Sequence, residues 1–171
     1  VKLLAVILLT MACVFAPGFA AAADKPVKIV VLGDSLSAGY GLSGPDAFPS
    51  KLATALKARG TAVEMINAGV SGDTATGGLG RLDWSVPDNA DAVIVELGAN
   101  DALRGVNPEV TRQSLESILQ KLKSRNIPVL LAGMLAPPNM GPEYVRDFNG
   151  IFPALAEKFG VVFYPFFLDG V

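Results

Sequence analysis

The chain has 171 residues, of which 51% are hydrophobic, with 14 Lys and Arg against 16 Asp and Glu. This length suits one domain with a full core, and the slightly acidic balance argues against nucleic acid as a partner, because phosphate binding depends on Lys and Arg. Cys13 is the only cysteine and histidine is absent, which argues against a disulfide framework and a thiolate metal site. No Walker loop or cluster of metal ligands occurs either, so we expect no metal and no cofactor.

The first 23 residues have the pattern of a signal peptide. Lys2 supplies a positive charge, residues 3–15 are apolar, and residues 20–23 are four alanines that suit a cleavage site. The apolar part is shorter than the roughly 20 residues that a membrane span needs, and Thr10-Met11-Ala12 before Cys13 is a poor lipobox. We therefore expect a periplasmic or secreted protein, with no stable membrane anchor after cleavage and one domain over residues 24–171.

Residues 29–32, Ile-Val-Val-Leu, are a short apolar run that ends at Gly33-Asp34-Ser35. Such a run predicts a buried strand of a parallel sheet, and Ser35 then follows its carboxyl end, where ligands bind in open α/β sheets. The alternative is that Gly-Asp-Ser is only a turn, since Asp and Ser hydrogen-bond their own backbone.

Helices and strands are predicted to alternate along the rest of the chain. The strands are expected at residues 62–67, 92–97, 127–134 and 161–164. The helices are expected at residues 48–59, with Phe48, Leu52, Ala55 and Leu56 on its apolar face, at about 75–84, from 108 onward with Val110, Leu115, Ile118, Leu119 and Leu122 as its apolar stripe, and at 143–159 with a kink at Pro153. This order predicts an α/β fold, a three-layer, flavodoxin-like, doubly wound parallel sheet.

Polar and glycine-containing turns follow three of the predicted strands. These are Gly33-Asp34-Ser35, Ser71-Gly72-Asp73 and Gly98-Ala99-Asn100-Asp101. The carboxyl ends of parallel strands open on one edge of the sheet, so the three turns are expected to meet. A serine that attacks an ester needs donors where the carbonyl oxygen becomes an oxyanion, and the backbone N–H groups of Ser35 and Gly72 and the amide of Asn100 are candidates.

Three sequence blocks, in this order, resemble the SGNH, or GDSL, hydrolase family. They are residues 33–37, Gly-Asp-Ser-Leu-Ser; residues 67–74, Asn-Ala-Gly-Val-Ser-Gly-Asp-Thr; and residues 96–101, Glu-Leu-Gly-Ala-Asn-Asp. The resemblance is greatest to the periplasmic arylesterase, thioesterase I and lysophospholipase subgroup. It implies that Ser35 is the nucleophile, that Gly72 and Asn100 form the oxyanion hole, and that small aryl or acyl esters, thioesters or lysophospholipids are the substrates.

The last block of that family, Asp-x-x-His, has no counterpart in a chain without histidine. Asp169 follows the last predicted strand too closely to take its place. Our expectation is that the C-terminal part of the domain, with the general base and a final helix, is missing, that one face of the sheet is therefore partly bare, and that this chain has little or no turnover, because a serine hydroxyl without a base is a weak nucleophile. We expect structural roles for three aspartates: Asp34 and Asp101 as turn or helix caps, and Asp73 as a carboxylate that favours the dipole of the helix that follows it.

Two alternatives to the esterase remain. A carbohydrate acetylesterase of the same fold would need aromatic platforms, for which Trp84 and three tyrosines are available. A non-catalytic binding module could be an inactive member of the family, or a flavodoxin-like protein that holds a phosphate at residues 71–77. In the esterase, Leu36, Tyr40, Val70, Leu103 and residues 135–140 would shape the acyl pocket. The oligomeric state does not follow from the sequence.

Overall fold

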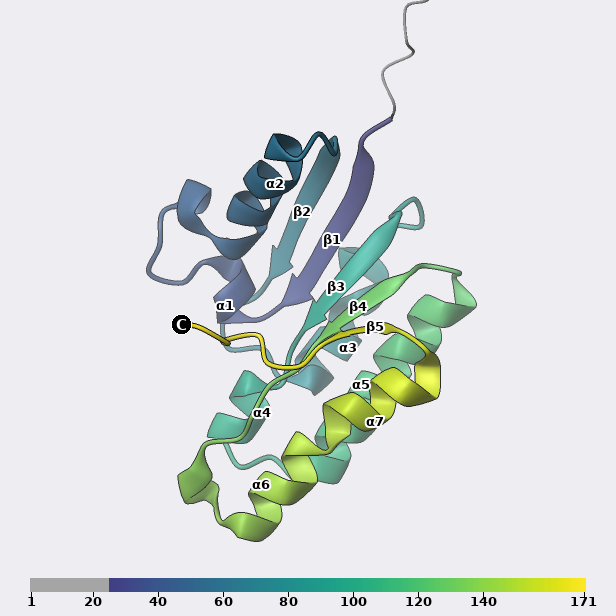
Figure 1. Cartoon of the computed structure of the whole chain (residues 1–171). Coiled ribbons are helices and arrows are strands. Elements are labelled where there is room, and N and C mark those ends of the chain that lie inside the picture. The colour runs from purple at the N-terminus through teal and green to yellow at the C-terminus, as the bar shows by residue number, and fades with distance from the viewer. Residues whose placement is uncertain (1–24) are drawn as a thin grey trace, which may run out of the picture.

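The computed structural model describes residues 25–171 (Figure 1). The predicted signal peptide, residues 1–23, lies outside the described residues. Within residues 25–171, no helix has the length and apolar character that a membrane span requires.

Five parallel strands form one sheet in the order β2-β1-β3-β4-β5. Their bounds are Val27–Gly33 (β1), Val63–Gly69 (β2), Ala92–Glu96 (β3), Val129–Ala132 (β4) and Val162–Tyr164 (β5). All four pairings are parallel. The predicted α/β fold with a parallel sheet is confirmed, and the observed strands differ from the predicted ranges by only a few residues at each end.

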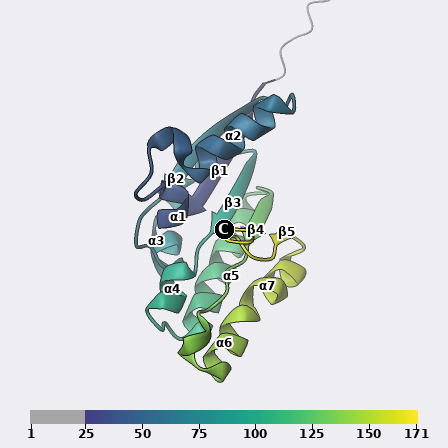
Figure 2. The same cartoon turned by 60° about the vertical axis from the view of Figure 1, so that its left-hand side comes forward.

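Helices cover the two faces of the sheet unequally (Figures 1 and 2). The helices are Ser35–Ala38 (α1), Phe48–Ala58 (α2), Ala75–Ser85 (α3), Ala99–Leu103 (α4), Pro108–Ser124 (α5), Pro142–Asn149 (α6) and Ile151–Phe159 (α7), with short 3-10 turns at Gly44–Asp46 and Pro138–Met140. One face, with Val30 and Val95, packs against α3, α5 and α7 in a single apolar cluster. The other face carries α1 and α2, which contact β1 and β2.

The second face is open over β4 and β5. Val162 is 65% exposed and Tyr164 44% exposed, and an apolar groove of about 560 Å³ runs between α2 and the strands, lined by residues that include Phe48, Leu52, Ile94, Leu130 and Phe167. The expected apolar face of α2 is accordingly only half-buried, and Ala55 is exposed. One sheet face is thus partly bare, as expected.

The buried face of α5 differs from the predicted stripe at its first position. Val110 is 44% exposed, whereas Thr111 is fully buried. The Thr111 hydroxyl donates to Oδ1 of Asp101 at 3.0 Å, so this polar side chain belongs to the packed face. Leu115, Ile118, Leu119 and Leu122 are buried as predicted.

The helix predicted over residues 143–159 is two helices, α6 and α7, separated at Gly150. The expected interruption near Pro153 is confirmed, and it falls at Gly150, on the N-terminal side of the proline, whose ring and missing N–H disrupt a continuous helix. Pro153 is the third residue of α7, where a backbone N–H has no intrahelical acceptor, so the missing N–H costs nothing.

Replacing Pro153 by alanine is therefore expected to change the free energy of unfolding by less than about 1 kcal/mol. A proline inside one continuous helix would instead destabilise it by about 3 kcal/mol, and its removal would stabilise the protein by a similar amount. Urea unfolding of the two proteins distinguishes these cases, and a gain near that larger value would contradict the two-helix arrangement.

Candidate active site

Three strand ends lie at the same level of the sheet. Gly33, the last residue of β1, pairs with Gly69 at the end of β2 and with Glu96 at the end of β3. The turns that follow these strands carry Ser35, Gly72 and Asn100. The register thus brings the three turns to one edge of the sheet, as the sequence predicted.

Ser35 is the first residue of the four-residue helix α1 and is half-buried. Asp34 caps this helix, because its Oδ1 accepts from the Leu36 N–H at 2.9 Å. Gly39 ends the helix in a left-handed conformation, and its N–H donates to the Ser35 carbonyl. The Gly-Asp-Ser turn is therefore a rigid, capped turn that holds Ser35 next to the end of β1.

Gly72 lies in the turn between β2 and α3, with a φ of +87°, a backbone conformation that residues with a Cβ rarely adopt. Its carbonyl accepts from Nη2 of Arg104 at 2.8 Å, which ties this turn to the residue that follows α4.

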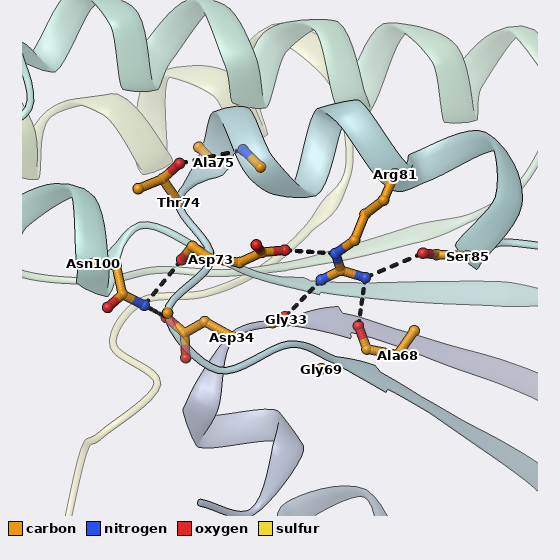
Figure 3. Close-up of polar contacts among 12 residues, drawn as sticks. Gly33, Asp34, Ala68, Gly69, Asp73, Thr74, Ala75, Arg81, Ser85 and Asn100 are labelled. Atoms are coloured by element: carbon orange, nitrogen blue, oxygen red, sulfur yellow. Dashed lines mark hydrogen bonds and ion pairs between the residues drawn. The ribbon is translucent and has the colours of Figure 1, made fainter.

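Asn100 connects the three turns (Figure 3). Its amide Nδ2 donates to the Asp73 carbonyl at 2.9 Å and to Oδ2 of Asp34 at 3.2 Å. Both amide hydrogens are thereby engaged, one by the turn after β2 and one by the turn after β1. A substrate oxygen at this position would have to compete with the longer bond, the one to Asp34.

Two buried carboxyl groups lie under the Ser35 turn. Burial raises the pKa of Asp34, and Asp101 and Asp73 add to this effect, although the Leu36 N–H and the Asn100 amide oppose it. Burial raises the pKa of Glu96 to about 8, and Asp34 contributes to that shift. Oε2 of Glu96 accepts from Oγ of Ser37 at 2.7 Å and from the Asp34 N–H at 3.3 Å.

Two other aspartates near the site have structural contacts. Asp101 is fully buried, and its Oδ2 accepts from the N–H of Ala75, the first residue of α3, at 2.8 Å. Asp73 was expected to favour the start of α3 through the helix dipole, but Thr74 caps that helix and Asp73 forms an ion pair with Arg81. Asp34 and Asp101 therefore accept from backbone N–H groups at the starts of helices, as expected, whereas the carboxylate of Asp73 pairs with Arg81.

Arg81 and Glu96 were not singled out from the sequence. Arg81 lies in a glycine-rich helix whose pattern is weak, and Glu96 occurs at the end of an apolar strand inside the third block. A charged residue in an otherwise buried element is the signal that could have identified both, since such residues are almost never fully buried unless they are paired.

Exposed apolar side chains lie in the segments that follow β1, β2, β3 and β4. Tyr40, Val70, Leu103 and Leu135 are 80%, 41%, 69% and 44% exposed, respectively, so these four do not belong to the core. Leu36 borders the apolar groove beside α2. The residues that were expected to shape an acyl pocket therefore have apolar surface available on this side of the molecule.

The GDSL-like Lipase/Acylhydrolase family profile matches residues 31–170. Esterase TesA of Pseudomonas aeruginosa is 40% identical over 144 residues, which cover 84% of this chain and 72% of that protein. Thioesterase 1/protease 1/lysophospholipase L1 of Escherichia coli K12 is 42% identical over 153 residues, which cover 89% of this chain and 71% of that protein.

The crystal structure of AlinE4, described as an SGNH-hydrolase family esterase, superimposes with a TM-score of 0.84 at 50% identity, over 88% of this chain and 81% of that one. The fold and the resemblance expected from the three blocks are thereby confirmed. The chain belongs to the GDSL-like lipase/acylhydrolase family, also called the SGNH hydrolases, and its class is that of the carboxylic ester hydrolases.

Proposed function

We propose that this protein is an exported serine esterase that forms an acyl-enzyme on Ser35. The observation that carries the proposal is the convergence of Ser35, Gly72 and Asn100 at one edge of the sheet, held together by the two bonds of the Asn100 amide. The names of the relatives, which include an esterase, an arylesterase and a thioesterase, support ester hydrolysis.

In the proposed mechanism, Oγ of Ser35 attacks the acyl carbon and the oxyanion accepts hydrogen bonds from the backbone N–H groups of Ser35 and Gly72 and from Nδ2 of Asn100. A tetrahedral intermediate carries a full negative charge on this oxygen, so it competes for the Asn100 amide better than a neutral carbonyl does. The alcohol or thiol then leaves, and water releases the acyl group.

The proton of Ser35 needs a base, and the 171 residues include no histidine. Asp34 and Asp73 are already engaged by Asn100, Leu36 and Arg81. We therefore propose that this chain by itself turns over esters slowly, because a general base contributes about a hundred- to ten-thousand-fold to such reactions.

Small aryl or acyl esters, thioesters and lysophospholipids are the proposed substrates. The exposed apolar side chains of Tyr40, Val70, Leu103 and Leu135 favour an acyl group over a sugar. Trp84 is also exposed, but it lies in the last turn of α3, whereas the first turn of that helix is at the site, so it offers no platform for a carbohydrate next to Ser35.

Export is proposed from residues 1–23, and the product of cleavage would be a periplasmic or secreted domain without a stable membrane anchor.

Treatment of the chain with p-nitrophenyl acetate, followed by proteolysis and mass spectrometry, tests the proposal. We expect one acetyl group on Ser35, and we expect it to persist, because release needs the same missing base as acylation. Added imidazole should accelerate both steps. Acetylation spread over exposed lysines and serines, with none on Ser35, would contradict the esterase and favour a binding module.

Replacing Asn100 by alanine is expected to slow the acetylation of Ser35 by about a hundredfold or more, because one oxyanion donor is lost. The measurement is the release of p-nitrophenolate at saturating ester. Asn89, which is exposed, provides the matched control, and its replacement by alanine should leave the rate unchanged. An equal rate in the Asn100 variant would exclude that side chain from the oxyanion hole.

A further inference from the structure

Arg81 is a buried arginine in α3 whose guanidinium group reaches the strand ends (Figure 3). Its side chain is 7% exposed. Nη2 donates to the Gly33 carbonyl at 2.8 Å, Nη1 donates to the Ala68 carbonyl at 2.7 Å and to Oγ of Ser85 at 3.2 Å, and Nε donates to Oδ2 of Asp73 at 2.5 Å. All three nitrogens of the group are therefore in use.

These acceptors belong to the segments that carry the proposed site. The Gly33 carbonyl is the last one before Asp34-Ser35, the Ala68 carbonyl lies at the end of β2, and Asp73 directly follows Gly72. One planar, rigid group thus fixes the position of the Ser35 turn relative to the Gly72 turn. A lysine could not reproduce this arrangement, because its donors radiate from a single nitrogen.

The close approach of α3 depends on two of its glycines. A Cβ on Gly77 would lie 2.8 Å from Oδ1 of Asp73, and a Cβ on Gly78 would lie 2.3 Å from Cδ1 of Leu97. The glycines that weaken the helical pattern of residues 75–85 therefore let the helix lie against the end of β3 and against the Asp73 turn. This packing brings Arg81 within reach of both carbonyls.

The third turn joins the same network through Asp73. Its carboxylate accepts from Arg81 and its carbonyl accepts from the Asn100 amide. We propose that Arg81 is a positioning residue that sets the separation of the Ser35 and Gly72 N–H groups, and thus the geometry of the oxyanion hole. This inference rests on the proposed function, but the arrangement that it describes can be measured without any turnover.

The test is backbone amide hydrogen exchange, followed by NMR on the 171-residue chain with Arg81→Lys. We expect the hydrogen-bonded amides of the two turns, those of Leu36 and Gly39 after β1 and of Val70 and Asp73 after β2, to exchange about tenfold faster, the factor for one lost buried hydrogen bond, while amides in α5 and α7 keep their rates. The side-chain amide resonances of Asn100 should shift as well. A uniform increase throughout the sheet, or no change at these four amides, would overturn the proposal.

Arg125 is the matched control, because it is also a largely buried arginine that bonds a carbonyl and a carboxylate. It donates to the Val86 carbonyl at 2.6 Å and pairs with Asp88 at 3.1 Å, at the other end of α3. Arg125→Lys should leave the exchange of the Leu36, Gly39, Val70 and Asp73 amides unchanged. If it accelerates those amides as much as Arg81→Lys does, the effect is one of general stability and the proposal fails.

Asp73→Asn is the second variant, in case Arg81→Lys does not fold. It keeps Arg81 and the shape of the turn but weakens the Nε bond, so the local acceleration should appear first at the Val70 amide, which donates to the Gly33 carbonyl; unchanged exchange there would also overturn the proposal. The proposed esterase function and the proposed role of Arg81 are contradicted by different results. Absence of acetyl transfer to Ser35 in the unaltered chain contradicts the esterase, whereas unchanged amide exchange in the variants contradicts the role of Arg81.

Discussion

Replacing Ser35 by alanine is expected to abolish the transfer of an acetyl group from p-nitrophenyl acetate to this chain. The methyl side chain of alanine has no nucleophile, and the hydroxyl groups of Ser37 and Thr74 are already engaged in hydrogen bonds. Ser37 is fully buried, and its Oγ donates to Glu96. Thr74 accepts from the Gly77 N–H as the cap of α3. Intact-protein mass spectrometry, with and without imidazole, measures the result.

Ser43→Ala serves as the control for this experiment. Ser43 is exposed in the loop after α1 and donates only to Asp46. Acetylation of the Ser43 variant should equal that of the unaltered chain. If the Ser35 variant is acetylated at the same rate and to the same extent, the three converging turns are not an esterase site, whatever the family of the chain.

The effect of Ser35→Ala should also separate nucleophilic attack from binding. The substitution removes one oxygen from a half-buried position and leaves the backbone N–H of residue 35 in place, since α1 is capped by Asp34 and not by the serine hydroxyl. The variant is therefore expected to keep its affinity for an ester analogue, and to unfold at nearly the same urea concentration. Loss of folding would indicate that the serine has a structural role as well.

The sheet and most of its helices could be predicted because their signals are local. Apolar runs bounded by glycine or proline identify the strands, and the spacing of Leu115, Ile118, Leu119 and Leu122 identifies the buried side of α5. The proximity of the three turns could be predicted, because the carboxyl ends of parallel strands lie at the same edge of the sheet. The strand order β2-β1-β3-β4-β5 is that of a flavodoxin-like sheet, the fold class expected from the sequence.

Tertiary contacts explain where the predictions were wrong or incomplete. Val110 is exposed because the Asp101 carboxylate satisfies the hydroxyl of Thr111, which makes the polar residue the buried one. The break between α6 and α7 is a local effect that was predicted, but its position at Gly150, three residues before Pro153, was not. Arg81 could not be identified from the periodicity of α3, because its contacts are with backbone carbonyls of β1 and β2.

Glu96→Gln is expected to reverse its effect on stability between acid and alkaline pH. Glu96 is fully buried, and within residues 25–171 its Oε1 has no hydrogen-bond partner. Burial, with a contribution from Asp34, raises the pKa of this carboxyl from 4.5 to about 8. Between pH 4.5 and about 8, Glu96 is therefore protonated in the folded protein and ionised in the unfolded chain.

Proton linkage determines whether the free energy of unfolding rises or falls with pH. Between the two pKa values the folded state binds more protons than the unfolded state, so the free energy of unfolding falls as the pH rises from 4.5 to about 8. Over the whole interval the decrease is on the order of 5 kcal/mol. Glutamine cannot ionise, so the variant lacks this part of the pH dependence, while the contribution of Asp34, whose pKa is also raised, remains in both proteins.

Glutamine has a cost of its own at low pH. Its carbonyl can accept from Ser37 and from the Asp34 N–H, but its amide nitrogen would replace the unpartnered oxygen, and a buried donor without an acceptor costs about 1–3 kcal/mol. The variant should therefore be less stable than the original at about pH 5 and more stable at about pH 9, with the two curves crossing in between.

Urea unfolding across this pH range measures both curves. Glu64→Gln is the control, because that side chain is 53% exposed and pairs only with Lys28, so its curve should follow that of the unaltered chain. Parallel curves for Glu96→Gln would mean that Glu96 ionises with an ordinary pKa in the folded protein. If the curves do cross, the Glu96 carboxyl is neutral near pH 7. It then accepts hydrogen bonds from Ser37 and from the Asp34 N–H without adding a second negative charge next to Asp34 and the developing oxyanion.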